Sequence, residues 1–324
     1  MASRMIGAEI GSSTLKLVVY EKNELKKLAV KRMPEDLVRE GRVISPDAMT
    51  GFLKEMRKEF GIPSGPCSLV LPQQLVIAHH VLMPVMNDAE LRLNLPYEFR
   101  EFVGADSGKY DYDYSVLSVK EGTMELYGAA VRKDVVEQFY EIFRKAGLRL
   151  KVAIPGEMAW MNLVDRAVDA PQKLCVVDVG QDFTQVSIFS GRNFAMGKDI
   201  EMGGLLLDQA IAQARSVDVH VARNHKEADF EGVLSLDACV EVYQTLAIEI
   251  MKAVNFYSYS DTDRSERLED IYICGGSAAI EPLRDAICRA TGMTLHPIRE
   301  LLGTEAEEDA RSCALAAGAA VQKR

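Results

Sequence analysis

Long hydrophobic runs are missing from this sequence of 324 residues. Nowhere do roughly 18 apolar residues follow one another, which is about the length that a membrane-spanning helix requires. The opening segment MASRMIGAEIG also lacks the hydrophobic stretch of an export signal. We therefore expect a cytoplasmic protein without direct membrane insertion.

Paired cysteines and clusters of basic residues are also scarce. The six cysteines are scattered without a Cys-x-x-Cys pair, so we expect reduced thiols. The net charge is -10, and no stretch gathers Lys and Arg into a basic stripe. Because nucleic acids and anionic lipid surfaces are bound through such clusters, neither is an expected partner.

One short motif occurs twice, 169 positions apart. Glu9-Ile10-Gly11 and Asp178-Val179-Gly180 each close an apolar strand with an acid, an aliphatic residue and glycine, before another strand begins. Glycine at such a turn lets backbone N–H groups approach an anion, because no Cβ stands in the way. The repeat predicts two phosphate-binding turns that grip one nucleotide across a cleft.

The length predicts about two domains, since single cores rarely grow beyond about 250 to 300 residues. Strands rich in Val, Ile and Leu predict a three-stranded meander over residues 5–32. We expect an α/β insert at 66–146. The first domain is then expected at 1–65 with 147–171 and 305–324, and the second at 172–304.

A third motif, Cys274-Gly275-Gly276-Ser277, follows a predicted strand and precedes a helix. The order and spacing of the three motifs resemble the actin-like ATPase superfamily, over nearly the whole chain. The resemblance implies an α/β fold of the actin-like (ribonuclease H-like) type, with two duplicated domains around a central nucleotide cleft.

Narrower features resemble the PilM family of type IV pilus assembly proteins. They are IGSSTLKLVV, the insert with LNLPYEFREFVG, Ala146-Gly147-Leu148 and the total length. The cell-division protein FtsA carries a similar insert, called 1C, but typically ends in a basic amphipathic membrane helix. This chain instead ends in Ala-rich sequence.

The PilM resemblance implies a partner, the cytoplasmic N-terminal tail of a PilN-like inner-membrane protein. The chain would then lie at the inner face of the membrane through that partner. Extended peptides bind at sheet edges and in side-chain pockets. The apolar segment of the insert is the expected wall of the groove, with Leu95, Tyr97, Phe99 and Phe102 as its residues.

The superfamily resemblance also implies that ATP or ADP binds with Mg²⁺. The expected nucleotide-binding residues are Glu9, Gly11, Ser12, Ser13, Thr14, Lys16, Asp178, Gly180, Thr184, Gly203, Gly204, Lys226, Gly275, Gly276 and Ser277. Glu9 and Asp178 would hold the metal through water. Glu157 falls about where superfamily ATPases place a residue near the attacking water, although a carboxylate that stabilises a helix N-terminus explains it equally well.

Three departures from the superfamily pattern bear on hydrolysis. Glu9 replaces the usual Asp and is one methylene longer, while Mg²⁺ demands strict octahedral geometry. Asp182 puts a carboxylate in the second turn, where phosphate would lie. Arg223 replaces the Glu that accepts hydrogen bonds from ribose, and guanidinium has no acceptor atom. We expect at most a slow ATPase, and if Arg223 is the obstacle to ribose recognition, Arg223→Glu should tighten nucleotide binding.

Three functions remain open from the sequence. The first is a nucleotide-responsive scaffold that binds a peptide from its membrane partner. The second is an actin-fold ATPase or small-molecule kinase, although no motif for a catalytic Asp and an acceptor pocket stands out. The third is an FtsA-like filament-forming protein. The sequence leaves open whether the chain self-associates.

Overall fold

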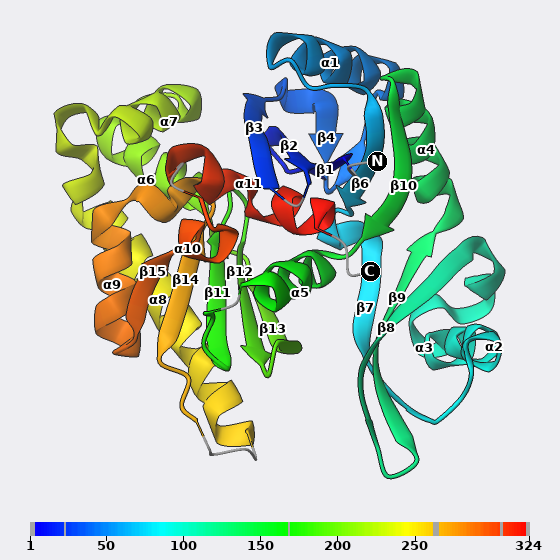
Figure 1. The fold of residues 1–324 in the computed structure, drawn as a ribbon. Coiled ribbons are helices and arrows are strands. Elements are labelled where there is room, and N and C mark those ends of the chain that lie inside the picture. Colours follow the sequence, from blue (N-terminus) through cyan, green and yellow to red (C-terminus); the bar gives the residue numbers. More distant parts are fainter. Residues whose placement is uncertain (1–3, 23, 168, 262–265, 305–306, 322–324) are drawn as a thin grey trace. The chain divides into compact units, whose positions relative to one another are not determined.

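The computed structural model describes residues 4–321 except 23, 168, 262–265 and 305–306 (Figure 1). The chain divides into two compact units. Unit 1 comprises Met1–Asn162 with Leu315–Arg324, and unit 2 comprises Leu163–Ala314. No helix in the described part of the chain is long and apolar enough to cross a membrane.

Unit 1 is built on a five-stranded sheet in the order β10-β6-β1-β2-β3. Its strands are β1 (Arg4–Ile10), β2 (Thr14–Glu21), β3 (Glu24–Arg32), β6 (Gly65–Val70) and β10 (Leu148–Ile154). The first three pair antiparallel and form the predicted meander, while β6 runs parallel to both β1 and β10. A two-stranded ribbon, β4 (Val38–Arg39) with β5 (Arg42–Val43), follows the meander.

Two helices bury their apolar faces in the same core as this sheet. In α1 (Pro46–Glu59), Ser45 caps the N-terminus by accepting from the Ala48 N–H, and Pro46 occupies the first turn, where its missing N–H costs little. The second helix, α4 (Lys133–Lys145), contributes Phe139 and Phe143 to that core. Its side chains therefore stabilise the main sheet of unit 1.

The insert contains a three-stranded antiparallel sheet in the order β7-β9-β8, covered by two short helices. Its elements are β7 (Val76–Pro84), α2 (Asp88–Glu98), α3 (Arg100–Val103), β8 (Tyr110–Lys120) and β9 (Thr123–Arg132). The predicted insert, residues 66–146, also includes most of β6 and all of α4. The structure assigns both to the main sheet and its core, because β6 pairs with β1 and α4 packs on β10.

Unit 2 repeats the strand arrangement of unit 1, with the order β13-β12-β11-β14-β15. The strands are β11 (Lys173–Val179), β12 (Thr184–Ser190), β13 (Asn193–Ile200), β14 (Asp270–Cys274) and β15 (Thr294–Pro297). The helices are α6 (Gly204–Arg215), α7 (Val219–Ala228), α8 (Asp237–Ser260), α9 (Glu281–Thr291) and α10 (Arg299–Leu302). In each unit an antiparallel meander lies on one side of the central strand and parallel strands lie on the other.

The chain passes between the units inside two helices, α5 (Gly156–Arg166) and α11 (Glu307–Ala320), and not at the predicted boundaries near 171 and 305. Within unit 1, the Asn162 side chain donates to the Gly318 carbonyl at 3.0 Å. Within unit 2, the Arg192 guanidinium donates to the Val164 carbonyl at 2.7 Å. Asn162 and Val164, two positions apart in α5, are thus bonded to different units.

The Ala-rich helix α11 lies very close to β1 in unit 1. A Cβ added at Gly7 would come within 1.7 Å of the Ala316 carbonyl oxygen, and one added at Gly318 within 2.1 Å of the Ala159 carbonyl oxygen. Both positions therefore require glycine. The C-terminal part of α11 is therefore packed tightly within unit 1.

Candidate nucleotide site

Backbone hydrogen bonds close the turn between β1 and β2 and join it to the residue that follows β3. The Gly11 N–H donates to the Thr14 carbonyl at 3.0 Å, and the Met33 N–H donates to the Ser13 carbonyl at 2.9 Å. A Cβ at Gly11 would lie 3.2 Å from the Thr14 oxygen, which is a tight contact. Ser12 is exposed at the tip, while Ser13 and Thr14 are partly buried.

Glu9 and Lys16 face each other across this hairpin. They are partners in the register of β1 and β2, and the Lys16 ammonium donates to the Glu9 carboxylate in an ion pair. Both side chains are largely buried. Lys16 was expected to offer its charge to a phosphate, and Glu9 to hold a hydrated metal. In the structure the two charges compensate each other, so a phosphate would compete with Glu9 for the ammonium.

The turn between β11 and β12 has the same closure. The Gly180 N–H donates to the Phe183 carbonyl at 3.1 Å, so the hydrogen bond spans the same number of residues as in the first turn. Asp178 pairs with Gln185 in the register, as Glu9 pairs with Lys16. The predicted duplication of the two hairpins is thus confirmed at the level of the backbone.

The start of α6 is fixed to this second turn. The N–H groups of Gly204 and Leu205 donate to the carbonyls of Gly180 and Gln181, at 2.9 Å and 2.8 Å. A Cβ at Gly203 would lie 2.6 Å from the Gln181 oxygen, so glycine is required there by the close approach of the turn. Those two N–H groups are consequently engaged within the protein. The Gly203-Gly204 pair thus joins α6 to the hairpin, and its part in nucleotide binding stays a prediction.

Asp208, which the sequence analysis did not single out, is the centre of the polar cluster in unit 2. Its carboxylate is fully buried in α6 and contacts three side chains. The Lys226 ammonium lies 2.6 Å from one oxygen, while the Arg223 Nε and the Gln181 amide donate to the other at 3.0 Å and 2.8 Å. Lys226 also donates to the Gly204 carbonyl at 2.8 Å.

This cluster explains the arginine at position 223. Arg223 and Lys226 together bring two positive charges to one buried carboxylate, and a buried charge is costly unless it is paired. Arg223→Glu would set two carboxylates against each other in this buried place. The expectation that this substitution tightens nucleotide binding is therefore abandoned.

Burial lowers the pKa of the Lys226 ammonium below its ordinary value, although the hydrogen bond from Lys226 to Asp208 acts in the opposite direction. The lysine is thus held as a charged donor mainly by Asp208. Removal of that carboxylate would favour the neutral amine.

The glycine motif after β14 lies against the end of β11. Gly275 adopts a φ of +92°, and its N–H donates to the Arg311 carbonyl at 2.9 Å. A Cβ at Gly275 would come within 2.5 Å of an Asp178 carboxylate oxygen. A Cβ at Gly276 would meet no heavy atom within 4 Å, so space is available beside this residue.

Four of the predicted residues, namely Gly180, Gly204, Lys226 and Ser277, lie together at the start of α6. A Cβ at Gly204 would lie 2.8 Å from the Ser277 hydroxyl and 3.0 Å from the Lys226 ammonium. The structure therefore brings Gly204, Lys226, Ser277 and the second turn together within unit 2. Thr184, at the start of β12, is fully buried and donates to the Met202 carbonyl at 2.8 Å, which fixes the loop before α6.

The sequence of the chain matches one known protein family over almost its whole length. A family model described as "Type IV pilus assembly protein PilM" matches residues 7–321. The chain belongs to the PilM family. It is a type IV pilus assembly protein, as the sequence motifs predicted. Comparison with curated proteins gives no match.

Solved structures share the fold of this PilM family member. One described as "PilM-PilN type IV pilus biogenesis complex" matches with a TM-score of 0.84 and 24% identity, over 98% of this chain and 99% of that chain. The ethanolamine utilization protein EutJ from Carboxydothermus hydrogenoformans matches with a TM-score of 0.63 and 15% identity, over 98% and 89%. MreB5 of Spiroplasma citri bound to ADP matches with 0.54 and 13%, over 97% and 94%. The predicted actin-like fold is confirmed.

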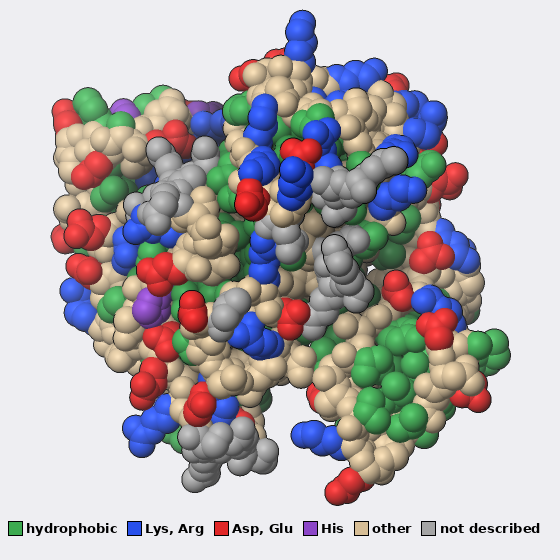
Figure 2. Space-filling model, in the orientation of Figure 1, with side chains coloured by type: hydrophobic (Ala, Val, Ile, Leu, Met, Phe, Trp, Pro, Cys, Tyr) green, Lys and Arg blue, Asp and Glu red, His purple; other side chains and the backbone are tan. Residues whose placement is uncertain are grey.

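The four residues predicted to bind a partner separate into two pairs. Leu95 and Phe99 are fully buried in the core of the insert, because α2 and the residue that follows it turn them towards the sheet. Tyr97 and Phe102 are exposed, by 69% and 51%. Hydrophobic side chains gather on the surface of the insert (Figure 2). The prediction is therefore corrected: Leu95 and Phe99 support this surface from below and do not form it.

The residues predicted to hold the metal or to act in hydrolysis are Glu9, Asp178 and Glu157. Among the described residues, no group of three or more His, Cys, Asp or Glu side chains could hold a metal ion. Glu157 lies in the first turn of α5, where a carboxylate stabilises the helix. Asp182 is exposed in the second turn. The roles of Glu9, Asp178 and Glu157 in metal binding and hydrolysis stay predictions.

Proposed function

We propose that this chain is a nucleotide-binding scaffold of a type IV pilus machine, and that it binds the cytoplasmic tail of a PilN-like membrane protein. The family match over residues 7–321 carries this proposal. It is supported by the similarity over nearly the whole chain to a PilM–PilN complex. Through such a partner the chain would lie at the inner face of the membrane.

The nucleotide part of the proposal rests on the polar cluster of unit 2. Asp208 neutralises one of two cations, so Arg223 and Lys226 together keep one excess positive charge. The Lys226 ammonium lies next to Gly204, close to the Ser277 hydroxyl that follows the open space at Gly276 in the chain. An anionic ligand such as ATP or ADP fits that charge. Mg²⁺ would accompany the phosphates, with Glu9 and Asp178 as its expected anchors through water. Hydrolysis would be slow at most, because Glu9 is already paired with Lys16.

Calorimetric titration with ATP and Mg²⁺ tests this part. Lys226→Gln should weaken binding by about tenfold, since one charge-assisted contact is lost. Lys252→Gln is the matched control, because Lys252 is exposed on α8 and pairs with Glu249. Equal affinity in both variants would remove Lys226 from the site, and no binding by the unmodified chain would overturn the nucleotide proposal.

The peptide part of the proposal rests on the exposed face of the insert. Tyr97 and Phe102 offer large aromatic surface, and such residues dominate the energy of many interfaces. Strand β8 lies at an edge of the insert sheet, where an extended peptide can add by backbone pairing. We therefore propose that a membrane-anchored tail pairs with the edge strand and packs against the exposed aromatic side chains of the insert.

Fluorescence anisotropy with a labelled peptide, the N-terminal tail of the PilN-like protein, tests this part. Tyr97→Ala and Phe102→Ala should each weaken binding by about tenfold. Tyr259→Ala is the control, because Tyr259 is a highly exposed aromatic residue on α8 in unit 2. Unchanged affinity in both insert variants would place the peptide elsewhere. Phe99→Ala is uninformative here, since it would disturb the buried core of the insert.

A further inference from the structure

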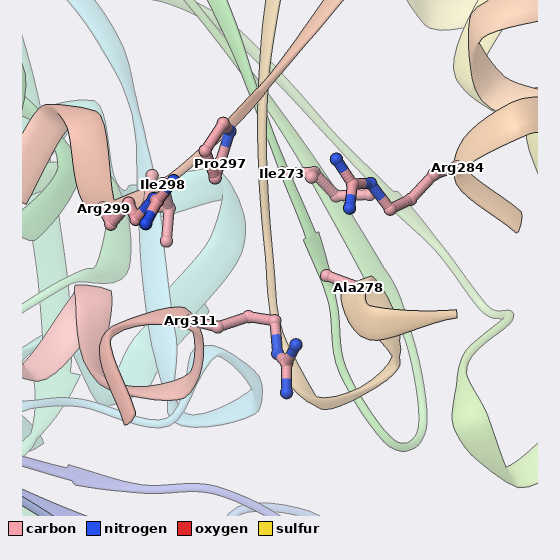
Figure 3. A pocket seen from close by; sticks show the side chains of 7 residues that line it. All are labelled: Ile273, Ala278, Arg284, Pro297, Ile298, Arg299 and Arg311. Atoms are coloured by element: carbon pink, nitrogen blue, oxygen red, sulfur yellow. The ribbon is translucent and has the colours of Figure 1, made fainter. Parts of the chain in front are cut away.

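A small hollow lies in unit 2 at the ends of β14 and β15. It is lined by Ile273, Ala278, Arg284, Pro297, Ile298, Arg299 and Arg311, and its volume is about 20 Å³ (Figure 3). None of these residues belongs to the Asp208 cluster or to the expected nucleotide-binding set. The hollow is therefore a separate feature of the fold.

Of the seven described residues that line the hollow, three are arginines and none is acidic. They come from three elements: Arg284 from α9, Arg299 from α10 and Arg311 from α11. In Figure 3 the Arg284 side chain reaches from α9 towards Ile273 on β14. Such a gathering of positive charge is unusual in a chain whose net charge is -10.

Two of the three arginines, Arg284 and Arg311, are incompletely neutralised by the described part of the chain. Neither Arg284 nor Arg311 forms an ion pair with a described carboxylate, and both are partly buried. The Arg311 Nε is buried and has no hydrogen-bond partner among the described residues. A buried donor without an acceptor is costly, and an entering oxyanion would relieve that cost.

We propose that this hollow binds a compact oxyanion, namely phosphate or the terminal phosphate of a small phosphate ester. Guanidinium groups match phosphate oxygens with paired, charge-assisted hydrogen bonds. A volume of about 20 Å³ holds roughly one water-sized group, so only the oxygens of such a head group can enter. A base or sugar ring does not fit inside.

The hollow is linked to the glycine motif through Arg311. The backbone carbonyl of this residue accepts the Gly275 N–H at 2.9 Å, while its side chain lines the hollow. A phosphate held by the Arg311 guanidinium would therefore immobilise the residue that fixes Gly275. Occupancy of the hollow would stabilise the backbone beside the Ser277 hydroxyl.

The experiment is a titration of the full-length chain with inorganic phosphate at constant ionic strength, followed by calorimetry and by the arginine Nε–H signals in NMR spectra. We expect a dissociation constant on the order of 1 mM. The signals of Arg284, Arg299 and Arg311 should shift together. Arg284→Gln and Arg299→Gln should each weaken binding by about tenfold. The control Arg289→Gln, an exposed arginine on the same helix as Arg284, should leave it unchanged.

Two further arms separate the possible outcomes. Lys226→Gln should retain phosphate binding, which distinguishes this hollow from the nucleotide site and leaves the two proposals independent. Glycerol 3-phosphate that binds more tightly than inorganic phosphate would identify an ester as the ligand, and the reverse would identify free phosphate. No shift of the three signals, or equal affinity in the Arg284, Arg299 and Arg289 variants, would overturn the proposal.

Discussion

In the β1–β2 hairpin the Glu9 carboxylate pairs with Lys16 on the neighbouring strand, whereas the matching positions of the β11–β12 hairpin hold Asp178 and Gln185. In the first hairpin, Lys16 thus supplies the positive charge that compensates the Glu9 carboxylate. The second takes its cations from α7, where Arg223 and Lys226 reach the buried Asp208 of α6. Duplication preserved the backbone of the turn and left the charges around it free to diverge.

The largest effect is expected from removing the acid at the centre of the unit 2 cluster. Asp208→Ala should lower the free energy of unfolding by about 3 to 5 kcal/mol, because it leaves two buried cations without their carboxylate. Urea denaturation followed by circular dichroism measures this, since the single tryptophan, Trp160, lies in unit 1. Asp285→Ala, at an exposed position on α9, should change the value by less than about 0.5 kcal/mol. Similar losses in both variants would contradict the central role of Asp208.

A smaller loss of stability is expected when either of the two turn glycines is replaced by alanine. Gly180→Ala should cost about 1 to 3 kcal/mol, because its Cβ would lie 2.9 Å from the Phe183 carbonyl oxygen. Gly11→Ala should cost less, since the corresponding distance to the Thr14 oxygen is 3.2 Å. The same denaturation measurement ranks the two variants. A larger loss for Gly11→Ala would show that the second turn is the more tolerant one.

The smallest effect is a dependence of stability on pH in unit 2. Burial lowers the pKa of Lys226 below its ordinary 10.5, so the unfolded chain binds this proton more readily than the folded chain. As pH rises between the two pKa values, the folded state should therefore gain stability through this group. Lys226→Gln should lack that gain. Unfolding curves at several alkaline pH values test this, and parallel trends for both proteins would contradict it.

The backbone of the site could be predicted from sequence because its signals are local. An acid, an aliphatic residue and glycine between two apolar strands define each hairpin, and Gly275 is required by a positive φ. Asp208 carried no such signal. It is one acid within the apolar helix Leu205 to Ile211, and only the approach of α7 reveals its partners.

The sequence of the insert contains a helical spacing that distinguishes its buried residues from its exposed ones. Leu91, Leu95 and Phe99 are spaced by four residues, which places them on one face of a helix, and all three are buried. Tyr97 lies two positions from Leu95 and points the other way. Counting the helical period would have separated the core residues from the surface residues. By contrast, the sequence of α4 shows that one face of the helix is apolar. It does not show which sheet of unit 1 that face covers.

The close contact of α11 with β1 has a consequence for how the protein is made. Ala316 and Gly318 complete the packing around Gly7 and Ala159, yet the ribosome adds them after the whole of unit 2. Domains usually fold in the order of their synthesis. The small apolar cluster of Val70, Ala159 and Ala319 therefore cannot close before α11 has been synthesised, whereas the rest of unit 2 precedes that segment in the chain.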